Sequence, residues 1–199
     1  MTEGILNQPA LDQLFLEART HVYWQDRRVD DATLRRLYDL LKMAPTSVNC
    51  NPLRIHFLRT SEAKARLMPA LAEGNRQKVE QAPVTAILAY DRRFHDHLPE
   101  LFPHVDARAW FVGDEPHREE TAFRNSSLQG GYFIVAARAL GLDVGPLSGF
   151  DNDMVDSLFF AERHPHYRSN FLCNLGYGHE AGLRPRGPRL SFDQACALL

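Results

Sequence analysis

The sequence MAPTSVNCNP, residues 43–52, decides how the chain around it must fold. Pro45 has no backbone N–H and disfavours the helical region for Ala44, so a helix that precedes this stretch has to end there. Four hydroxyl or carboxamide side chains follow, those of Thr46, Ser47, Asn49 and Asn51. They are too polar for a core, and the stretch is therefore predicted to be a loop.

The loop side chains can both give and accept hydrogen bonds. They are therefore suited to the edge of a flat heterocycle on which donors and acceptors alternate, and a flavin ring is one such ligand. The same groups can instead satisfy the backbone of the loop itself through Asx and hydroxyl turns. This stretch alone leaves both interpretations open.

A second stretch, GLDVGPLSGF at residues 141–150, closes a long helix pattern and turns again after a few extended residues. Gly145 and Gly149 remove side chains where a planar ligand could approach the backbone. The amides of Leu147, Ser148 and Gly149 could then point at the edge of that ligand. The two stretches together favour a flavin-type site.

The motifs APTSxNxxP and GLxxGPLxGF resemble the nitroreductase family of FMN-dependent NAD(P)H oxidoreductases, and the likeness covers nearly the whole chain. Within the family, the sequence is most similar to malonic semialdehyde reductases of pyrimidine utilisation. The segments that carry this closer likeness include ARTHVYW, EGNRQKVEQAPVTAILAYD, LFPHVDARAWF, ETAFRNSSLQGGY and PRLSFDQACALL.

The resemblance implies an α+β fold in one domain over residues 1–199: a three-layer α/β/α sandwich with a mostly antiparallel central sheet, assembled as a homodimer. FMN would carry the hydride at N5, without a catalytic side chain, in ping-pong turnover with NADPH or NADH. The implied reaction is reduction of malonic semialdehyde to 3-hydroxypropionate. A broad NAD(P)H nitroreductase or quinone reductase is the alternative, and a non-catalytic flavin-binding protein is a remote one.

The resemblance also assigns residues to the cofactor. The ring edge and ribityl chain would be held by Pro45, Thr46, Ser47, Asn49 and Asn51. The turn after the second motif would hold N5, through an amide of Ser148 or Gly149 beside Pro146. Lys78 would lie nearest the flavin pyrimidine, because a fixed cation there favours the reduced, negatively charged ring. A solvated lysine at a helix end is the other interpretation.

The phosphate site departs from the family pattern RRSxRxF. In that pattern, basic residues and a serine bind the FMN phosphate. Ala18 and Val22 replace two of the basic residues, so only Arg19 and the Thr20 hydroxyl match the pattern.

The C-terminal tail carries Arg184, Arg186 and Arg189, spaced to converge on an anion if the tail is extended. The resemblance implies that an arginine before the final segment binds the phosphate as well; Arg189 is the first candidate and Arg186 the second. Each could instead be an ordinary exposed arginine.

A carboxylate on the substrate would need a cation above the flavin. The resemblance suggests Arg108, in HVDARAWF, or Arg124, in AFRNSS. Both could instead form structural ion pairs with nearby acids, namely Asp106, Glu119 or Glu120.

The histidine-rich segment at residues 92–117 is not predicted to bind a metal, because His95 and His97 share a side only in a strand, whereas the surrounding residues look helical or irregular. The segment is expected to cover the flavin instead. Its aromatic residues would line the pocket or form dimer contacts; they are Phe102, Trp110 and Phe111.

Composition narrows the class of protein. The 199 residues are 44% hydrophobic, enough for one sizeable core, and a net charge of −2 gives no reason to expect nucleic acid or a membrane as partner. The N-terminus lacks the basic and apolar regions of a signal peptide, and the three cysteines are odd in number and far apart. These features predict a cytoplasmic protein with reduced thiols.

The hydrophobic pattern predicts the main elements. Helices are expected from Pro9, from residues 30 or 31 to 44, over 61–71 and over 119–140. The apolar face of the second helix would consist of Leu34, Leu37, Tyr38, Leu41 and Ala44. The last helix carries small residues that allow close helix approach, and the resemblance implies that it packs against the partner subunit; they are Ser126, Ser127, Gly130 and Gly131. Strands are expected at 53–59, 84–90 and 171–175, with the apolar run VTAILAY at 84–90 as the buried central strand.

Overall fold

The computed structural model of the protein describes residues 4–199, and an antiparallel sheet forms its middle layer. The strands lie in the order β1-β2-β4-β3, and each pairs antiparallel with its neighbour. Their bounds are β1 Leu53–Leu58, β2 Val84–Asp91, β3 Asp143–Leu147 and β4 Tyr167–Gly176. The predicted strands are therefore present, and the predicted central strand is buried along its whole length.

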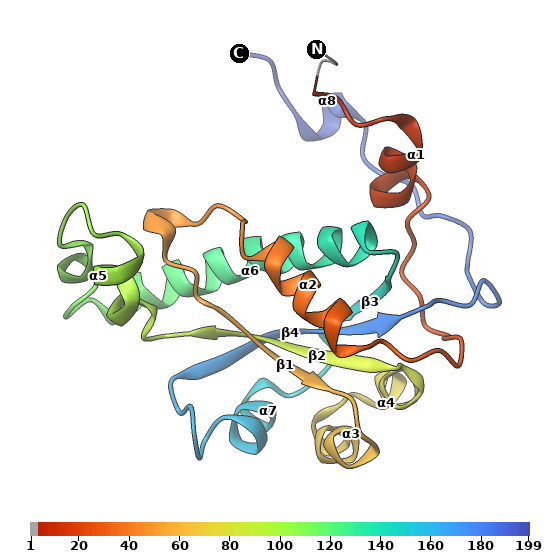
Figure 1. Cartoon of the computed structure of the whole chain (residues 1–199), viewed down its shortest axis with the longest axis horizontal. Coiled ribbons are helices and arrows are strands. Elements are labelled where there is room, and N and C mark those ends of the chain that lie inside the picture. The colour runs from red at the N-terminus through yellow and green to blue at the C-terminus, as the bar shows by residue number, and fades with distance from the viewer. Residues whose placement is uncertain (1–3) are drawn as a thin grey trace.

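Helices cover both faces of the sheet (Figure 1). On one face lie α2 Asp31–Leu41 and α6 Glu115–Ala139; on the other lie α3 Ser61–Leu67, α4 Glu73–Gln81 and α7 Asn152–Phe159. Residues of β2 alternate between the two hydrophobic clusters so formed: Val84, Ala86 and Leu88 pack with α2 and α6, and Ile87 and Ala89 with the other helices. This arrangement confirms the predicted α+β three-layer sandwich.

The remaining helices are short. Their bounds are α1 Gln8–Leu11, a π-helical turn Asp12–Leu16, α5 Leu98–Leu101 and α8 Phe192–Ala195, with 3₁₀ turns at Ser47–Asn49, Met68–Ala70, Phe94–His97 and Ala107–Trp110. The segments that carry α1 and α8 project from the same side of the body as two arms (Figure 1). No helix in residues 4–199 is long and apolar enough to cross a membrane.

Helix α2 shows how local chemistry delivers the chain to the first motif. The Asp30 carboxylate accepts a hydrogen bond from the Thr33 amide at 2.7 Å and caps the helix. Leu34, Leu37 and Leu41 are buried against the sheet. Tyr38, expected on the same apolar face, is instead 51% exposed. The helix ends before Pro45, as the sequence predicts.

Helix α6 begins four residues before its predicted start, because Asp114 caps it by accepting from the His117 amide at 3.0 Å. It ends before Gly141, whose φ of +72° suits glycine at a helix C-terminus. A Cβ at Gly130 would lie 2.6 Å from the Phe171 ring, so this glycine lets α6 approach its own sheet. Part of the small-residue pattern expected at a subunit contact therefore serves packing within the chain.

Candidate functional site

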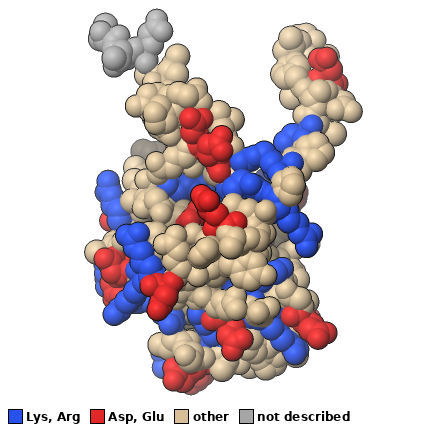
Figure 2. All heavy atoms as spheres, turned by 90° about the vertical axis from the view of Figure 1, so that its right-hand side faces the viewer, with Lys and Arg blue, Asp and Glu red and all other residues tan. Residues whose placement is uncertain are grey.

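Six basic side chains line a cavity of about 910 Å³ between the N-terminal segment, α4, the end of α6 and the C-terminal tail. We call it the cationic cavity. Its basic side chains are Arg19, Lys78, Arg138, Arg184, Arg186 and Arg189. In Figure 2, basic side chains gather where the two arms leave the body. Within residues 4–199, no carboxylate forms an ion pair with any of these six.

The N-terminal wall of the cavity is held by strand β3. Thr20 forms a parallel bridge with Val144, whose carbonyl accepts from the His21 amide at 3.0 Å. A Cβ at Gly145 would lie 2.5 Å from the His21 carbonyl oxygen. Gly145 therefore provides a close approach, as predicted, but the segment that approaches it is the chain itself.

The tail wall is held by arginines that bind backbone. Arg186 donates to the carbonyls of Leu16 and Ala18, the latter at 3.0 Å, and Arg19 donates to the Arg184 carbonyl. Arg189 donates only within the tail, to Gly187 and Pro188. Their charges remain uncompensated because carbonyl oxygens carry only partial charge.

Arg138 is the cation that burial affects most. Its guanidinium donates to the Leu14 carbonyl at 3.0 Å, but its Nε is buried without a hydrogen-bond partner. Burial, and then the charge of Arg186, lowers the pKa of Arg138. A buried donor left unpaired costs about 1–3 kcal/mol, and an anion bound in the cavity would remove that cost.

Beside the cavity, Asn75 connects Lys78 to the second motif. Lys78 Nζ donates to Asn75 Oδ1 at 3.0 Å, and Asn75 Nδ2 donates to the Gly149 carbonyl at 3.0 Å. A Cβ at Gly149 would lie 2.5 Å from Asn75 Nδ2, so the space that this glycine opens is filled by Asn75. The amides of Ser148 and Gly149 donate no hydrogen bond within the described chain and stay available to a ligand.

The first motif borders a different cavity, of about 660 Å³, which we call the loop cavity. Its lining includes Pro45, Asn49, Asn51, Arg54, His97 and Gln129. Val48, Asn49 and Asn51 have φ of 46°, 52° and 40°, a left-handed conformation that is unusual for a β-branched residue such as valine. Such strain costs about 1–3 kcal/mol per residue and concentrates at functional sites.

Hydrogen bonds explain how the strained loop persists. The Ser47 amide donates to Asn125 Oδ1 at 2.8 Å, and Asn49 Nδ2 donates to the Leu101 carbonyl at 2.9 Å. Asn51 donates to Asn49 and accepts from Gln129 Nε2 at 3.2 Å, while its amide donates to the Thr46 hydroxyl at 3.2 Å. Helices α5 and α6 thus hold the loop, and much of its polar capacity is used internally.

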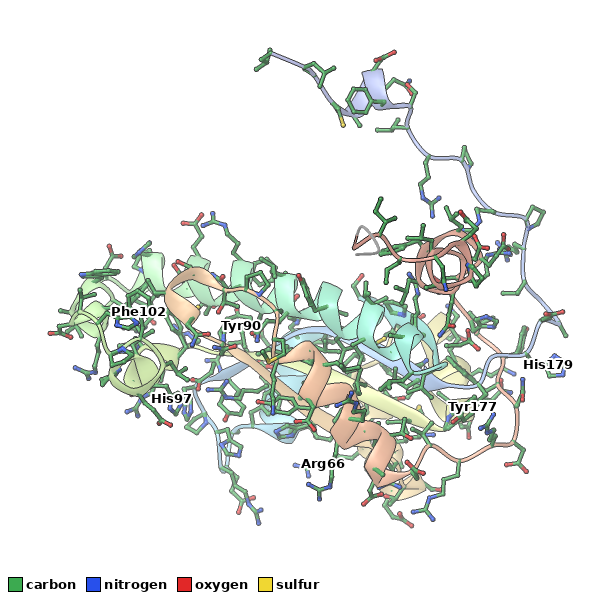
Figure 3. All side chains as sticks on the ribbon, turned by 45° about the horizontal axis from the view of Figure 1, so that its top comes forward. Arg66, Tyr90, His97, Phe102, Tyr177 and His179 are labelled. Atoms are coloured by element: carbon green, nitrogen blue, oxygen red, sulfur yellow. The ribbon has the colours of Figure 1, made fainter. Side chains whose placement is uncertain are left out.

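The two cavities lie at opposite ends of the molecule. Figure 3 places His97 and Phe102 at the α5 end, and Tyr177 and His179, which precede the tail, at the other end. The structure therefore groups Arg19, Thr20, Lys78, Arg186 and Arg189 in one cavity, and Pro45, Asn49 and Asn51 in the other. Thr46 and Ser47 belong to the loop itself. Gly149 is joined to Lys78 through Asn75, and Ser148 directly precedes Gly149. Pro146 is partly buried, pairs with Cys173 in the sheet and is not among the lining residues of either cavity.

The two candidate substrate arginines are paired with acids, as the alternative interpretation allowed. Arg108 donates to Asp96 at 3.1 Å, rather than to the acids named from the sequence. Arg124 pairs with Glu120 one helical turn away and is 68% exposed. Neither lines the cationic cavity or the loop cavity in the described chain. Their role in binding substrate stays a prediction.

The expected aromatic cover is corrected for one residue. Phe111 is 3% exposed and packs against Phe94, with ring centroids 4.9 Å apart, so it belongs to the core. Trp110 is exposed and Phe102 partly buried. In residues 4–199, no group of three or more histidine, cysteine or acidic side chains is arranged to hold a metal ion.

Three residues at or beside the two cavities escaped the sequence interpretation. Arg138 is a lone cation in the apolar half of a long helix, IVAARAL, and that position was a usable signal. Asn75 lies three residues before Lys78 on the same helix face. Buried Gln129 gave no local signal, because its role depends on the loop folding against it.

Comparison with known proteins agrees with this geometry. A family model described as the nitroreductase family matches residues 19–177. A Burkholderia lata protein, provisionally named NADH dehydrogenase/NAD(P)H nitroreductase, is 62% identical over 188 residues, which cover 94% of this chain and 95% of that protein. A Polynucleobacter asymbioticus protein with the same provisional name is 54% identical over 196 residues, 98% of this chain and 99% of its own.

A solved structure shares the fold. The chain provisionally called a nitroreductase from Exiguobacterium sibiricum, in complex with FMN, has a TM-score of 0.85 at 19% identity, over 100% of both chains. Fold and site thus define the class, an α+β sandwich with a cavity lined by basic side chains at one end. The chain belongs to the nitroreductase family, whose members depend on FMN and take electrons from NAD(P)H. At the level of the family, the predicted fold and the predicted cofactors are confirmed.

Proposed function

We propose that the protein is an FMN-dependent NAD(P)H oxidoreductase and that the cationic cavity binds the FMN phosphate. The observation that carries this proposal is the set of six cations that have no carboxylate partner among residues 4–199, one of which has a buried Nε without a hydrogen-bond partner there. A dianionic phosphate needs charged donors, and charge-assisted hydrogen bonds are about twice as strong as neutral ones. The residues proposed to hold it are Arg19, Thr20, Arg138, Arg184, Arg186 and Arg189.

The chain's own residues would orient the ring. Lys78 lines the cavity and would lie beside the ring, while the free amides of Ser148 and Gly149 can donate to the ring edge. When bound, FMN supplies the redox chemistry by taking a hydride from NAD(P)H and passing it to an acceptor. The protein supplies position and electrostatics, and its residues need not provide a nucleophile.

We also propose a homodimer with two flavin sites at the subunit boundary. The loop motif faces a different cavity from the phosphate residues, so a ring held by both would need a second chain. Exposed apolar residues support such a contact: Phe123, Leu128 and Tyr132 on α6, and Leu190, Phe192 and Leu198 on the C-terminal arm. A monomer that elutes with full FMN occupancy would contradict this proposal.

The proposed physiological acceptor is malonic semialdehyde, reduced to 3-hydroxypropionate, with a nitroarene or quinone as the alternative. The names of the relatives favour the alternative, since they refer to nitroreductases. The specific proposal is supported by the sequence likeness alone. Arg108→Ala or Arg124→Ala should raise the KM for malonic semialdehyde about tenfold, or about 1.4 kcal/mol, while leaving reduction of an uncharged quinone unchanged. Equal losses on both acceptors would leave the general reductase.

The domain and the compartment complete the proposal. We expect residues 1–199 to act as one domain in the cytoplasm. Cys50, Cys173 and Cys196 form no disulfide, which suits a reducing compartment.

Anaerobic stopped-flow spectroscopy of the purified protein tests the function. NADPH or NADH should bleach the bound flavin, and the acceptor that restores its colour identifies the reaction. Denaturation should release FMN; release of FAD, or a flavin that neither nucleotide reduces, would contradict the proposal.

A further inference from the structure

A buried polar pair lies directly behind Lys78. Thr85 on β2 and Asn174 on β4 face each other in the sheet register and are 0% and 1% exposed. The Thr85 hydroxyl donates to Asn174 Oδ1 at 2.7 Å, and Asn174 Nδ2 donates to the main-chain carbonyl of Lys78 at 3.1 Å. The hydroxyl therefore orients the carboxamide so that its NH₂ group points at Lys78.

The carbonyl of Lys78 needs a partner from outside its helix. Helix α4 ends at Gln81, so this carbonyl is one of the last four of the helix, and these accept no hydrogen bond from an N–H of the same helix. Asn174 satisfies it. Lys64 Nζ binds the carbonyls of Glu80 and Ala82 at the same helix end. Two side chains thus hold this end, and Asn174 acts on residue 78 itself.

Lys78 is consequently restrained at both its ends. Its carbonyl is held by Asn174, and its Nζ by Asn75, which in turn donates to the Gly149 carbonyl. The same carbonyl accepts from the Ala72 amide at 3.0 Å, which precedes α4. One hydrogen-bonded series therefore runs from the central sheet through Lys78 to the turn whose amides are free.

We propose that Asn174, oriented by Thr85, is a positioning residue that fixes the Lys78 cation against negative charge on reduced FMN. This inference rests on the proposed function. A charge already held in place needs no reorganisation when the opposite charge develops, and so stabilises that charge more than a mobile lysine can. Two core residues that line no cavity described above would then help to set the midpoint potential of the bound cofactor.

The competing explanation is that the pair only satisfies its own polar groups in the core. Both explanations expect a loss of folding stability when the pair is removed. They differ in the flavin potential, which moves only if the pair controls Lys78. Asn170 provides a matched control, since it lies on the same strand and its Nδ2 binds Ser126 and Ser127 of α6, on the other face of the sheet.

The experiment measures the two-electron midpoint potential of FMN bound to Asn174→Leu, Thr85→Val, Thr85→Ser and Asn170→Leu. We expect Asn174→Leu and Thr85→Val to weaken binding of reduced relative to oxidised FMN about tenfold, which makes the potential about 30 mV more negative. Thr85→Ser keeps the hydroxyl and should retain the wild-type potential. An unchanged potential in both Asn174→Leu and Thr85→Val, or an equal shift in Asn170→Leu, overturns the proposal.

A second measurement needs no cofactor. Hydrogen exchange at the amides of residues 79–82 should be faster in Thr85→Val than in the wild type, because the last turn of α4 is released; unchanged exchange overturns the proposal. Thr85→Val conserves shape, so it decides the matter if Asn174→Leu does not fold. Wild-type protein that lacks FMN would refute the proposed function, whereas flavin reduction by NAD(P)H with unmoved variant potentials refutes this inference alone.

Discussion

The cationic cavity and the loop cavity are built by opposite means. The first collects six cations from four segments that are far apart in sequence, and their charges have no carboxylate partner in the described part of the chain. The second is shaped by one short loop with three residues at positive φ, and most of its polar groups bind one another or α6. One region has unsatisfied charge, whereas the other has strain held by satisfied hydrogen bonds.

This difference indicates what each region contributes. Unpaired cations gain free energy only when an anion arrives, so the cationic cavity should supply affinity. A loop held by internal bonds is preformed, so it should supply shape at little cost in ordering. Substitutions in the first region should therefore weaken binding, and substitutions in the second should weaken folding.

The largest effect is expected at Arg138. Arg138→Met keeps the aliphatic length but removes the buried charge, so FMN affinity should fall by roughly 1.5–3 kcal/mol, about tenfold or more. The free energy of unfolding should hardly fall, because the unpaired Nε disappears as well. Titration of the apoprotein with FMN and chemical denaturation measure the two quantities. Arg118→Met, at the other end of α6, is the control, and equal weakening by both would break the comparison.

The counterpart in the loop region is Gln129, whose Oε1 accepts from the buried Leu53 amide at 3.0 Å. Gln129→Leu leaves that amide unpaired and releases Asn51, so the free energy of unfolding should fall by about 1–3 kcal/mol. Gln8→Leu, which removes only an exposed bond to Asp12, should change it little. Urea denaturation distinguishes the two, and equal stability of both variants would show that the loop does not depend on α6.

A smaller effect is expected where Asn75 fills the space left by Gly149. Gly149→Ala places a methyl group 2.5 Å from Asn75 Nδ2 and should break its bond to the Gly149 carbonyl. Affinity for FMN should drop by about 1 kcal/mol, the net value of one hydrogen bond. Gly74→Ala, on the same helix with no atom within 4 Å of the added carbon, serves as control. Tighter binding in Gly149→Ala would mean that Asn75 obstructs the ligand.

The smallest effect concerns the thiol in the loop. Burial raises the pKa of Cys50 to about 11 and that of Cys173 to about 12. At pH 8 both stay protonated and unreactive, whereas exposed Cys196 should react with a thiol reagent. Raising the pH to 9 should therefore not increase the number of thiols modified per native chain, because Cys50 stays protonated. Modification of a second thiol at pH 9 would show that the loop opens readily.

The sequence predicted what depends on neighbours along the chain. The buried strand 84–90, the helix that ends before Pro45 and the long helix that ends before Gly141 all follow from local pattern and backbone chemistry. The same local motifs identified the family, and they named most of the polar residues at the two cavities. Phe111 and Tyr38 were misplaced, because an apolar residue near a helix pattern has no fixed direction until the neighbouring elements pack.

Only the tertiary structure decided which of these residues share a site. Arg19, Lys78, Arg138 and Arg186 lie in different elements, and their meeting in one cavity depends on how the tail crosses the N-terminal segment. Thr85 and Asn174 became a pair through strand register, and Asn174 reached Lys78 through helix packing. Periodicity and turn chemistry act over a few residues, whereas hydrogen bonds and charge act through space, so the elements can be derived from the sequence but the contacts between them require the fold.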